Sequence, residues 1–214
     1  MEIAINIRKN KDITDTITIE ELERCECKII KIYQNDEDIK DIVMEAASKN
    51  NNNDKTIGEV GCRYIAGIRE IMKYIPNITV KEIDDMADEG AWKEDCWLDS
   101  NGIGIKANII DFSRLIKKLN IKYNVNLKYL WFNTYTNRNK DKLIRFLRNN
   151  VCPIIKMPNL VYKNADHFIN AIGYIEDTLG KVYLKMGETY NNYNGYDNYY
   201  IDWEDVKSYE FIYI

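Results

Sequence analysis

The chain has 214 residues, of which 45% are hydrophobic and 30% are charged, and this is enough for the core of one fair-sized domain. Its net charge of −4 argues against a nucleic acid as the main partner, because neutralising a phosphate backbone requires a basic surface. Five cysteines in a chain of this length do not predict a dense disulfide framework, so we expect a reducing compartment.

The N-terminus shows no basic segment followed by a long apolar one, and no apolar run approaches the length of a membrane span. We therefore expect a cytoplasmic protein without a membrane partner. The abundance of Asn, Ile and Lys is typical of an AT-rich bacterial or phage genome. A phage protein without a signal peptide would leave the cell by lysis.

The first half of the chain predicts mainly helices. Alternating apolar residues predict strands over residues 2–7 and 27–33, and residues 91–105 read as a structured loop. Capping patterns and apolar residues spaced by three and four predict helices that begin at Thr18 and that cover residues 36–48, 61–74, 79–87 and 107–119.

The second half changes to a period of two, which is typical of strands. Strands are expected over residues 121–131, 152–157, 167–175, 182–186 and 209–214. One helix is expected over residues 140–147, a loop over 191–200 and a single helical turn near Trp203. Helices first and strands last predict an α+β fold, in which a helical half packs against a mainly antiparallel sheet.

Two residues suggest nucleophilic chemistry. Cys62 falls in the first turn of a predicted helix, where unpaired backbone N–H groups and the helix dipole favour a thiolate. His167, the only histidine, stands at the start of a predicted strand and would serve as its base. A buried core cysteine and a structural histidine are the alternative interpretation of the same residues.

Four segments, in order, resemble a known family. Thr56–Cys62 with the apolar helix after it is similar to the nucleophile motif of bacterial papain-like cysteine peptidases related to the bacteriocin-processing, double-glycine-leader peptidases. The capping box at Thr79 resembles the next helix of that family. Leu147–Ile155 resembles its Pro-Val-Ile strand, and His167–Tyr174 resembles its histidine strand.

The resemblance covers about residues 30–214. It implies a papain-like peptidase domain over residues 31–214, with residues 1–30 as an N-terminal extension packed on that domain. It further implies a thiol hydrolase that cleaves an amide bond in a peptide or peptidoglycan-like substrate and uses no cofactor. No oligomeric state is predicted.

The resemblance also implies roles for three residues. Cys62 would be the nucleophile and His167 the general base. Tyr33-Gln34-Asn35-Asp36 is similar to the family's aromatic-x-Gln-x-Asp stretch, so Gln34 would donate to the oxyanion.

Two departures from the family pattern bear on activity. Arg63 and Tyr64 follow the nucleophile, where the family has small residues or proline. The family's orienting Asp or Asn would fall at Lys185 or Met186, and neither can accept a hydrogen bond from an imidazole N–H. Glu188 is the remaining candidate for the orienting residue. The alternative function is therefore a catalytically degenerate peptidase-fold protein that binds a protein or peptide partner.

The cysteines outside this motif do not predict a metal site. Cys25 and Cys27 are separated by one residue, and Cys96 stands far from both, so the spacing does not match a zinc knuckle. We expect no metal.

Overall fold

The computed structural model describes residues 2–9, 13–44, 55–98, 104–133, 136–158, 166–187, 189 and 199–214. Its helices are α1 (Ile57–Val60), α2 (Cys62–Tyr74), α3 (Val80–Asp88), α4 (Phe112–Tyr123) and α5 (Asn137–Arg148), with one 3-10 turn, η2 (Trp203–Asp205). In the described part of the chain, no helix combines the length and the apolar character needed to cross a membrane.

The strands are β1 (Glu2–Lys9), β2 (Ile13–Glu26), β3 (Val43–Met44), β4 (Lys55–Thr56), β5 (Trp92–Leu98), β6 (Gly104–Ile110), β7 (Lys128–Phe132), β8 (Ile154–Pro158), β9 (Asp166–Asp177), β10 (Val182–Gly187), β11 (Tyr199–Asp202) and β12 (Ser208–Tyr213). Eight of them form one sheet in the order β10-β11-β1-β2-β9-β8-β12-β7. The pairings are antiparallel except that β1 and β11 run parallel.

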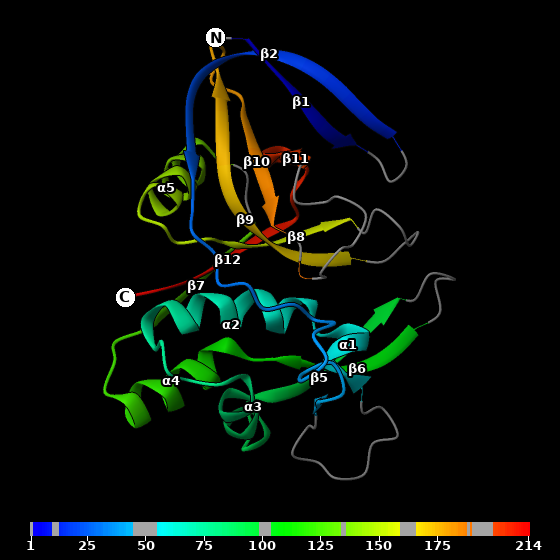
Figure 1. Ribbon diagram of the computed structural model, residues 1–214, viewed down its shortest axis with the longest axis vertical. Helices are drawn as coiled ribbons and strands as arrows, with labels where there is room; N and C mark the ends of the chain where they lie inside the picture. Colours follow the sequence, from blue (N-terminus) through cyan, green and yellow to red (C-terminus); the bar gives the residue numbers. More distant parts are fainter. Residues whose placement is uncertain are drawn as a thin grey trace.

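The sheet lies between two groups of helices (Figure 1). Helix α2 packs against one face of β8, β9 and β12, and α3, α4 and the β5–β6 hairpin lie beyond it. Helix α5 packs on the other face of these strands. The prediction of an α+β fold with a mainly antiparallel sheet is therefore confirmed.

Alternation along the strands divides their side chains between two cores. Ile154 and Phe168 pack in the core that contains α2, whereas Ile155 and Ile169 pack in the core that contains α5. Because both faces of these strands are covered, β8 and β9 read in the sequence as nearly continuous apolar runs.

The strands at the other end of the sheet close on themselves. Besides pairing with β2, the C-terminal half of β9 pairs with β10 along its other edge. The pairings from β9 through β10, β11, β1 and β2 back to β9 thus form a closed ring. A small core of Ile5, Ile19, Ile175 and Tyr183 accompanies this ring. Residues 1–30, predicted as an extension, contribute two of its strands.

Several predicted elements are confirmed. Helices α2, α3 and α5, strands β1, β8, β9, β10 and β12 and the turn η2 lie where the sequence places them, with ends displaced by a few residues. The capping box predicted at Thr79 is present, since its side chain accepts from the Glu82 N–H and the Glu82 carboxylate accepts from the Thr79 N–H.

Other predicted elements are wrong. Thr18 lies inside β2 and starts no helix, because β-branched residues spaced along this segment favour a strand over the capping pattern. Residues 27–33 form no strand. In place of the predicted helix 36–48, residues 37–41 form turns and residues 43–44 form β3. Residues 45–48 of that predicted helix lie outside the described residues.

The predictions for residues 91–131 also need correction. The predicted loop of residues 91–105 contains β5 and the first residues of β6, and these two strands pair as a hairpin. Helix α4 begins at Phe112 and continues to Tyr123, so residues 107–110 belong to β6 and residues 121–123 to the helix. Asp111 fixes the start, because its side chain accepts the N–H of Arg114 as a helix cap.

Candidate active site

Cys62 stands at a junction between two helices. Thr56 caps α1 with a complete capping box, and Gly61 separates α1 from α2. A Cβ atom at Gly61 would lie 2.6 Å from the carbonyl oxygen of Ile57, so only glycine allows this close turn. Cys62 is the first residue of α2, which confirms that it lies in the first turn of a helix.

The C-terminal half of α2 is fixed to the segment that leads into β8. Lys73 Nζ donates to the carbonyl oxygen of Asn150 at 2.9 Å. One carboxylate oxygen of Glu70 accepts the backbone N–H of Cys152 at 3.0 Å. These contacts bind one end of the helix to the sheet.

The N-terminal half of α2 is fixed to the beginning of β9. Asn170 Nδ2 donates to the carbonyl oxygen of Ala66 at 3.0 Å, and both residues are fully buried. The guanidinium carbon of Arg63 lies 5.8 Å from the centre of the Phe168 ring. Residues nearer the start of α2 therefore contact residues nearer the start of β9. The helix and the strand run in the same direction, and both begin at the same end of their contact.

This order of contacts relates Cys62 to His167. Arg63 follows Cys62 and faces Phe168, which follows His167. His167 is half-buried and pairs across the sheet with Met157. The structure thus brings the segments of the predicted nucleophile and base to one end of the α2–β9 contact. It does not place their side chains on one face, because Met157 packs in the core that contains α5 and its partner His167 lies on that same face of β9, away from α2.

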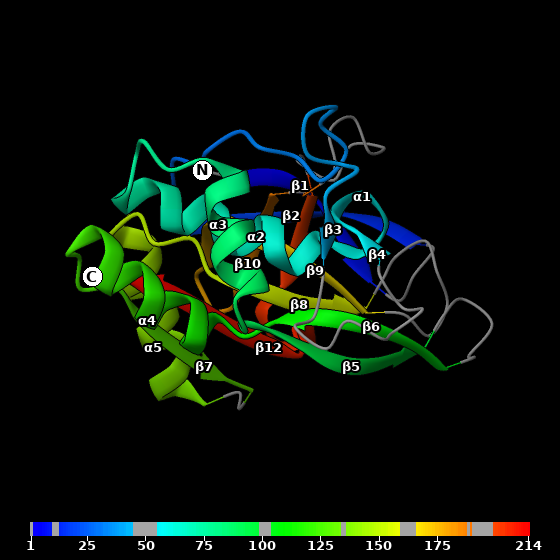
Figure 2. The same ribbon diagram turned by 90° about the horizontal axis from the view of Figure 1, so that it is seen from below.

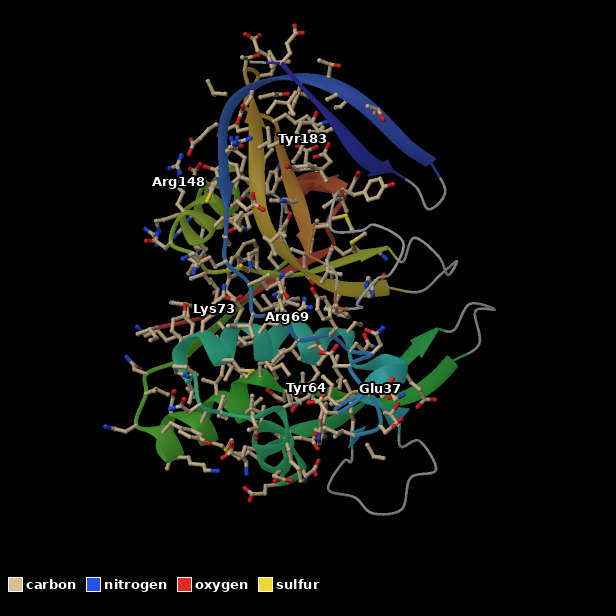
Figure 3. The ribbon with its side chains drawn as sticks, viewed as in Figure 1. Glu37, Tyr64, Arg69, Lys73, Arg148 and Tyr183 are labelled. Carbon is tan, nitrogen blue, oxygen red and sulfur yellow. The ribbon has the colours of Figure 1, made fainter. Side chains whose placement is uncertain are left out.

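Figure 3 shows the two sides of α2. Arg69 and Lys73 lie on the side that faces the sheet, and Tyr64 lies on the opposite side. Tyr64 packs against Trp92, with ring centres 5.1 Å apart. Burial raises the pKa of the Tyr64 hydroxyl well above its ordinary value, and Tyr64 is therefore a structural core residue.

Buried Arg69 links α2 to the segment that holds Gln34. Its Nε donates to the carbonyl oxygen of Ile32 at 2.8 Å, and its Nη1 donates to Asn170 Oδ1 at 3.3 Å. Its guanidinium also lies 5.1 Å from the ring centre of Tyr33. The chain just before Gln34 is thereby fixed to the same helix that begins with Cys62.

Gln34 itself is buried beside α1. Its Nε2 donates to the carbonyl oxygen of Gly58 at 3.0 Å, and its backbone N–H donates to the carbonyl oxygen of Thr189 at 2.6 Å. An amide nitrogen carries two hydrogens, so one donor of Nε2 is not used by the bond to Gly58. Gln34 therefore lies next to the short helix that directly precedes Cys62.

Two further observations concern the predicted residues. Cys62 is 7% exposed, so only a small part of the residue reaches the surface. Glu188, the predicted orienting residue, lies outside the described residues.

A cavity of about 800 Å³ opens beside this end of α2. Arg63 and Phe168, the residues that follow Cys62 and His167, both line it. The rest of its wall comes from the β5–β6 hairpin, the start of α4 and strands β7, β8 and β12. Figure 2 shows β5, β6, β8 and β12 in one region of the view, and Figure 1 shows that α2 lies at the level between the β5–β6 hairpin and the strands β8 and β12.

A buried ion pair forms the inner wall of the cavity. Arg63 donates to both carboxylate oxygens of Glu210, at 2.8 and 2.6 Å, and the Tyr129 hydroxyl donates to one of them at 2.8 Å. Burial and the adjacent Glu210 carboxylate both raise the pKa of the Tyr129 hydroxyl, which stays protonated as a donor. Glu210 is 3% exposed, so the protein covers nearly all of this carboxylate.

Sequence reasoning did not find this pair. The two residues are 147 positions apart, and no local pattern connects them. The one available signal was Arg63 itself, a cation at a helix start, where a positive charge is unfavourable unless a carboxylate lies nearby. The departure from the family pattern after Cys62 thus coincides with the wall of the cavity.

Three other cysteines lie apart from Cys62, at the opposite end of α2. Cys27 Sγ donates to the carbonyl oxygen of Leu147 at 3.1 Å, and Lys73 Nζ lies 3.1 Å from Cys152 Sγ. Burial raises the pKa of the Cys25 thiol, and the adjacent Cys27 together with burial raises that of Cys152. The thiols of Cys25 and Cys152 are therefore held in their protonated, less nucleophilic form.

Comparisons of the chain with models of protein families, with characterised proteins and with solved structures found no match.

Proposed function

We propose that this protein is a cysteine-dependent hydrolase with a papain-like fold, which cleaves an amide bond in a peptide or peptidoglycan-like substrate. Cys62 is the nucleophile, His167 the general base, and Gln34 an oxyanion donor. The observation that carries the proposal is the packing of α2 on β9, which starts both elements at one end beside an open cavity.

The chemistry follows from these groups. The proposal requires the His167 imidazole to turn to the α2 face of β9, where it takes the proton of the Cys62 thiol. The sulfur then attacks the carbonyl carbon of the substrate amide. The electron pair of the carbonyl moves to its oxygen, which accepts hydrogen bonds from Gln34 Nε2 and the Cys62 backbone N–H. The imidazolium returns the proton to the leaving amine, the C–N bond breaks, and water then hydrolyses the thioester.

The second candidate is a peptidase-fold protein that binds a peptide partner without cleaving it. Two observations favour it. Cys62 is 7% exposed, which limits the approach of a carbonyl group, and His167 lies on the face of β9 that points away from α2. Both candidates use the same cavity, and they differ in whether the sulfur reacts.

Alkylation with iodoacetamide near neutral pH, mapped by mass spectrometry, separates the two candidates. Cys25 is more exposed than Cys62 and serves as an internal control. If exposure alone governs labelling, Cys25 reacts first. If Cys62 is activated, it reacts first, and His167→Ala slows its labelling while that of Cys25 stays unchanged.

Hydrolysis is then measured on libraries of peptides and muropeptides. The wild type is expected to release a new amine that neither Cys62→Ala nor His167→Ala releases. Gln34→Ala is expected to lower kcat roughly a hundredfold, the usual cost of one lost oxyanion donor. Cleavage that survives Cys62→Ala, or faster labelling of Cys25, contradicts the proposal.

A further inference from the structure

The charges that surround the cavity suggest which substrates it accepts. Four cationic side chains line it, Arg63, Lys93, Lys156 and Lys207, against two carboxylates. The number of charges alone does not show whether the cavity prefers an anionic or a cationic ligand, because a carboxylate that faces the cavity could attract a cation. The hydrogen bonds of the carboxylates decide it.

Neither lining carboxylate is open to a cationic ligand. Glu210 is occupied by Arg63 and by the Tyr129 hydroxyl. Asp111 accepts the N–H of Arg114 as a helix cap and lies 3.4 Å from Lys93 Nζ. Burial raises the pKa of Asp111, but these contacts outweigh it and hold that pKa below its ordinary value.

The lysines at the β8–β12 side carry an excess of positive charge. Lys156 and Lys207 both contact Asp166, Lys156 through one carboxylate oxygen at 2.9 Å and Lys207 through the other. Two ammonium groups thus share one carboxylate. The side chains of Lys156 and Lys207 are 35% and 51% exposed, whereas that of Asp166 is 29% exposed, so the cations face the solvent more than the anion does.

The pairing of the strands holds the two lysines together. Ser208 pairs with Lys156 across the sheet, and the backbone N–H of Lys207 donates to the carbonyl oxygen of Lys156 at 2.7 Å. Each ammonium group has three hydrogens, and one bond to Asp166 leaves donors for a further anion. A ligand carboxylate at this point would therefore receive charge-assisted hydrogen bonds from two neighbouring strands.

Aromatic surface lies beside the lysines. The Phe168 ring lines the cavity with Lys156 Nζ 5.7 Å from its centre, and Trp131, on the same wall, is 52% exposed. Such a wall suits the aliphatic part of a side chain, with its charged end towards Lys156 and Lys207. Glutamate combines both features.

We propose that this cavity binds a carboxylate-bearing residue of the substrate, next to the amide bond that is cleaved, and that Lys156 and Lys207 recognise the carboxylate. This inference rests on the proposed function, because Cys62 and His167 do not themselves line the cavity and are only the chain neighbours of Arg63 and Phe168, which do. A glutamate of a protein and a glutamate of a peptidoglycan stem peptide present the same chemistry.

The first test compares isosteric substrates. Peptides with Glu or Gln at each position around the cleaved bond form one arm, and muropeptides with a free or an amidated glutamate carboxylate form the other. At one position, kcat/KM is expected to be roughly tenfold or more higher for the carboxylate than for the amide. The arm that shows this ratio identifies the source of the carboxylate. Equal rates in both arms overturn the inference, even though cleavage itself supports the proposed function.

Variants then test which residues cause the preference for the Glu substrate over the Gln substrate. Lys156→Met/Lys207→Met is expected to bring the Glu-to-Gln ratio close to one, through a loss of kcat/KM on the Glu substrate. Lys117→Met, which removes an exposed lysine on α4 outside the cavity, is expected to leave the ratio unaltered. A ratio that persists in the double variant overturns the assignment to these lysines. Circular dichroism confirms that each variant is folded.

A binding measurement keeps the inference independent of catalysis. Fluorescence anisotropy with the Cys62→Ala variant compares a labelled Glu peptide with its Gln counterpart. Tighter binding of the Glu peptide, lost in Lys156→Met/Lys207→Met, supports recognition of a carboxylate in the cavity even if the wild type cleaves nothing. Equal affinity of both peptides overturns it.

Discussion

At the residue scale, the pair of Arg63 and Glu210 joins the start of α2 to β12. The side chains are 11% and 3% exposed, so each charge depends on the other for compensation. Removing one partner leaves a buried charge without its counterion, and such changes cost about 3–5 kcal/mol in the free energy of unfolding. We therefore expect Arg63→Met to be strongly destabilising in urea denaturation.

The matched control for that prediction removes both charges. In Arg63→Met/Glu210→Leu no ion remains buried at this site, and apolar replacements of similar size are often tolerated. The double variant is expected to unfold with a higher free energy than Arg63→Met alone. Costs that simply add would show that the two charges do not interact.

The pKa of Asp166 predicts how the stability of the fold depends on pH. Burial raises its pKa, but contacts with Lys207 and Lys156 outweigh this, and the pKa lies below its ordinary value. The ionised form therefore stabilises the fold above the unfolded pKa of about 4, and this contribution is lost as the pH falls through the folded pKa. Unfolding free energies measured between about pH 5 and pH 3 should fall less steeply for Asp166→Asn than for the wild type.

An offset between the two curves at all pH values does not test this expectation, because the Asn variant also leaves two lysines unpaired. The difference in slope is the informative quantity. Identical slopes would mean that Asp166 titrates alike in the folded and unfolded chains.

The sequence predicts single residues where local chemistry decides their surroundings. Cys62 lies in the first turn of a helix because Gly61 and the apolar residues after it define that helix. Gln34 lies beside α1 through a bond to Gly58, a contact that no sequence pattern indicated, since only the resemblance related Gln34 to Cys62. The ion pairs of Glu210 and Asp166 were not predicted. Their partners lie on other elements, and no local sequence pattern indicates which strands become neighbours in the sheet.

At the element scale, the close approach of Phe112, the first residue of α4, to α2 depends on one glycine. A Cβ atom at Gly67 would lie 1.9 Å from Cζ of Phe112, which also forms part of the cavity wall. Alanine favours a helix by about 1 kcal/mol over glycine, but overpacking costs about 1–3 kcal/mol. Gly67→Ala is expected to lower the thermal midpoint, although the same change in an open helix would raise it.

A compensating variant tests the cause of that effect. In Gly67→Ala/Phe112→Leu the smaller side chain leaves room for the new methyl group, so part of the lost stability should return. Two losses that add independently would place the cause elsewhere than in this contact.

A helix or strand is predicted correctly where several sequence patterns indicate the same element, and wrongly where they conflict. Helix α2 has apolar spacing, a glycine before it and a proline after it, and all three indicate the same boundaries. In β2 the capping pattern at Thr18 competes with alternating β-branched residues, and pairing with both β1 and β9 favours the strand. Such pairing becomes visible only when the whole sheet is assembled.

At the scale of the whole molecule, the N-terminal hairpin completes the ring of strands. Without β1 and β2, the outer edges of β9 and β11 would lose their partners. Unpaired strand edges promote association between chains, and closure of a sheet removes them. Residues 1–30 therefore have a structural role that the resemblance, which begins near residue 30, did not suggest.

The hairpin should accordingly contribute to stability through its buried face. Ile19 is 6% exposed beside Ile175, whereas Leu22, in the same strand, is 62% exposed. Ile19→Ala is expected to lower the free energy of unfolding by about 2–5 kcal/mol and Leu22→Ala by less than about 0.5 kcal/mol. A chain that starts at Cys27 should lose more than Ile19→Ala and should associate in size-exclusion chromatography, because it also frees two strand edges. A shortened chain that stays monomeric with an unchanged thermal midpoint would show that the ring is dispensable and that residues 1–26 are a true extension.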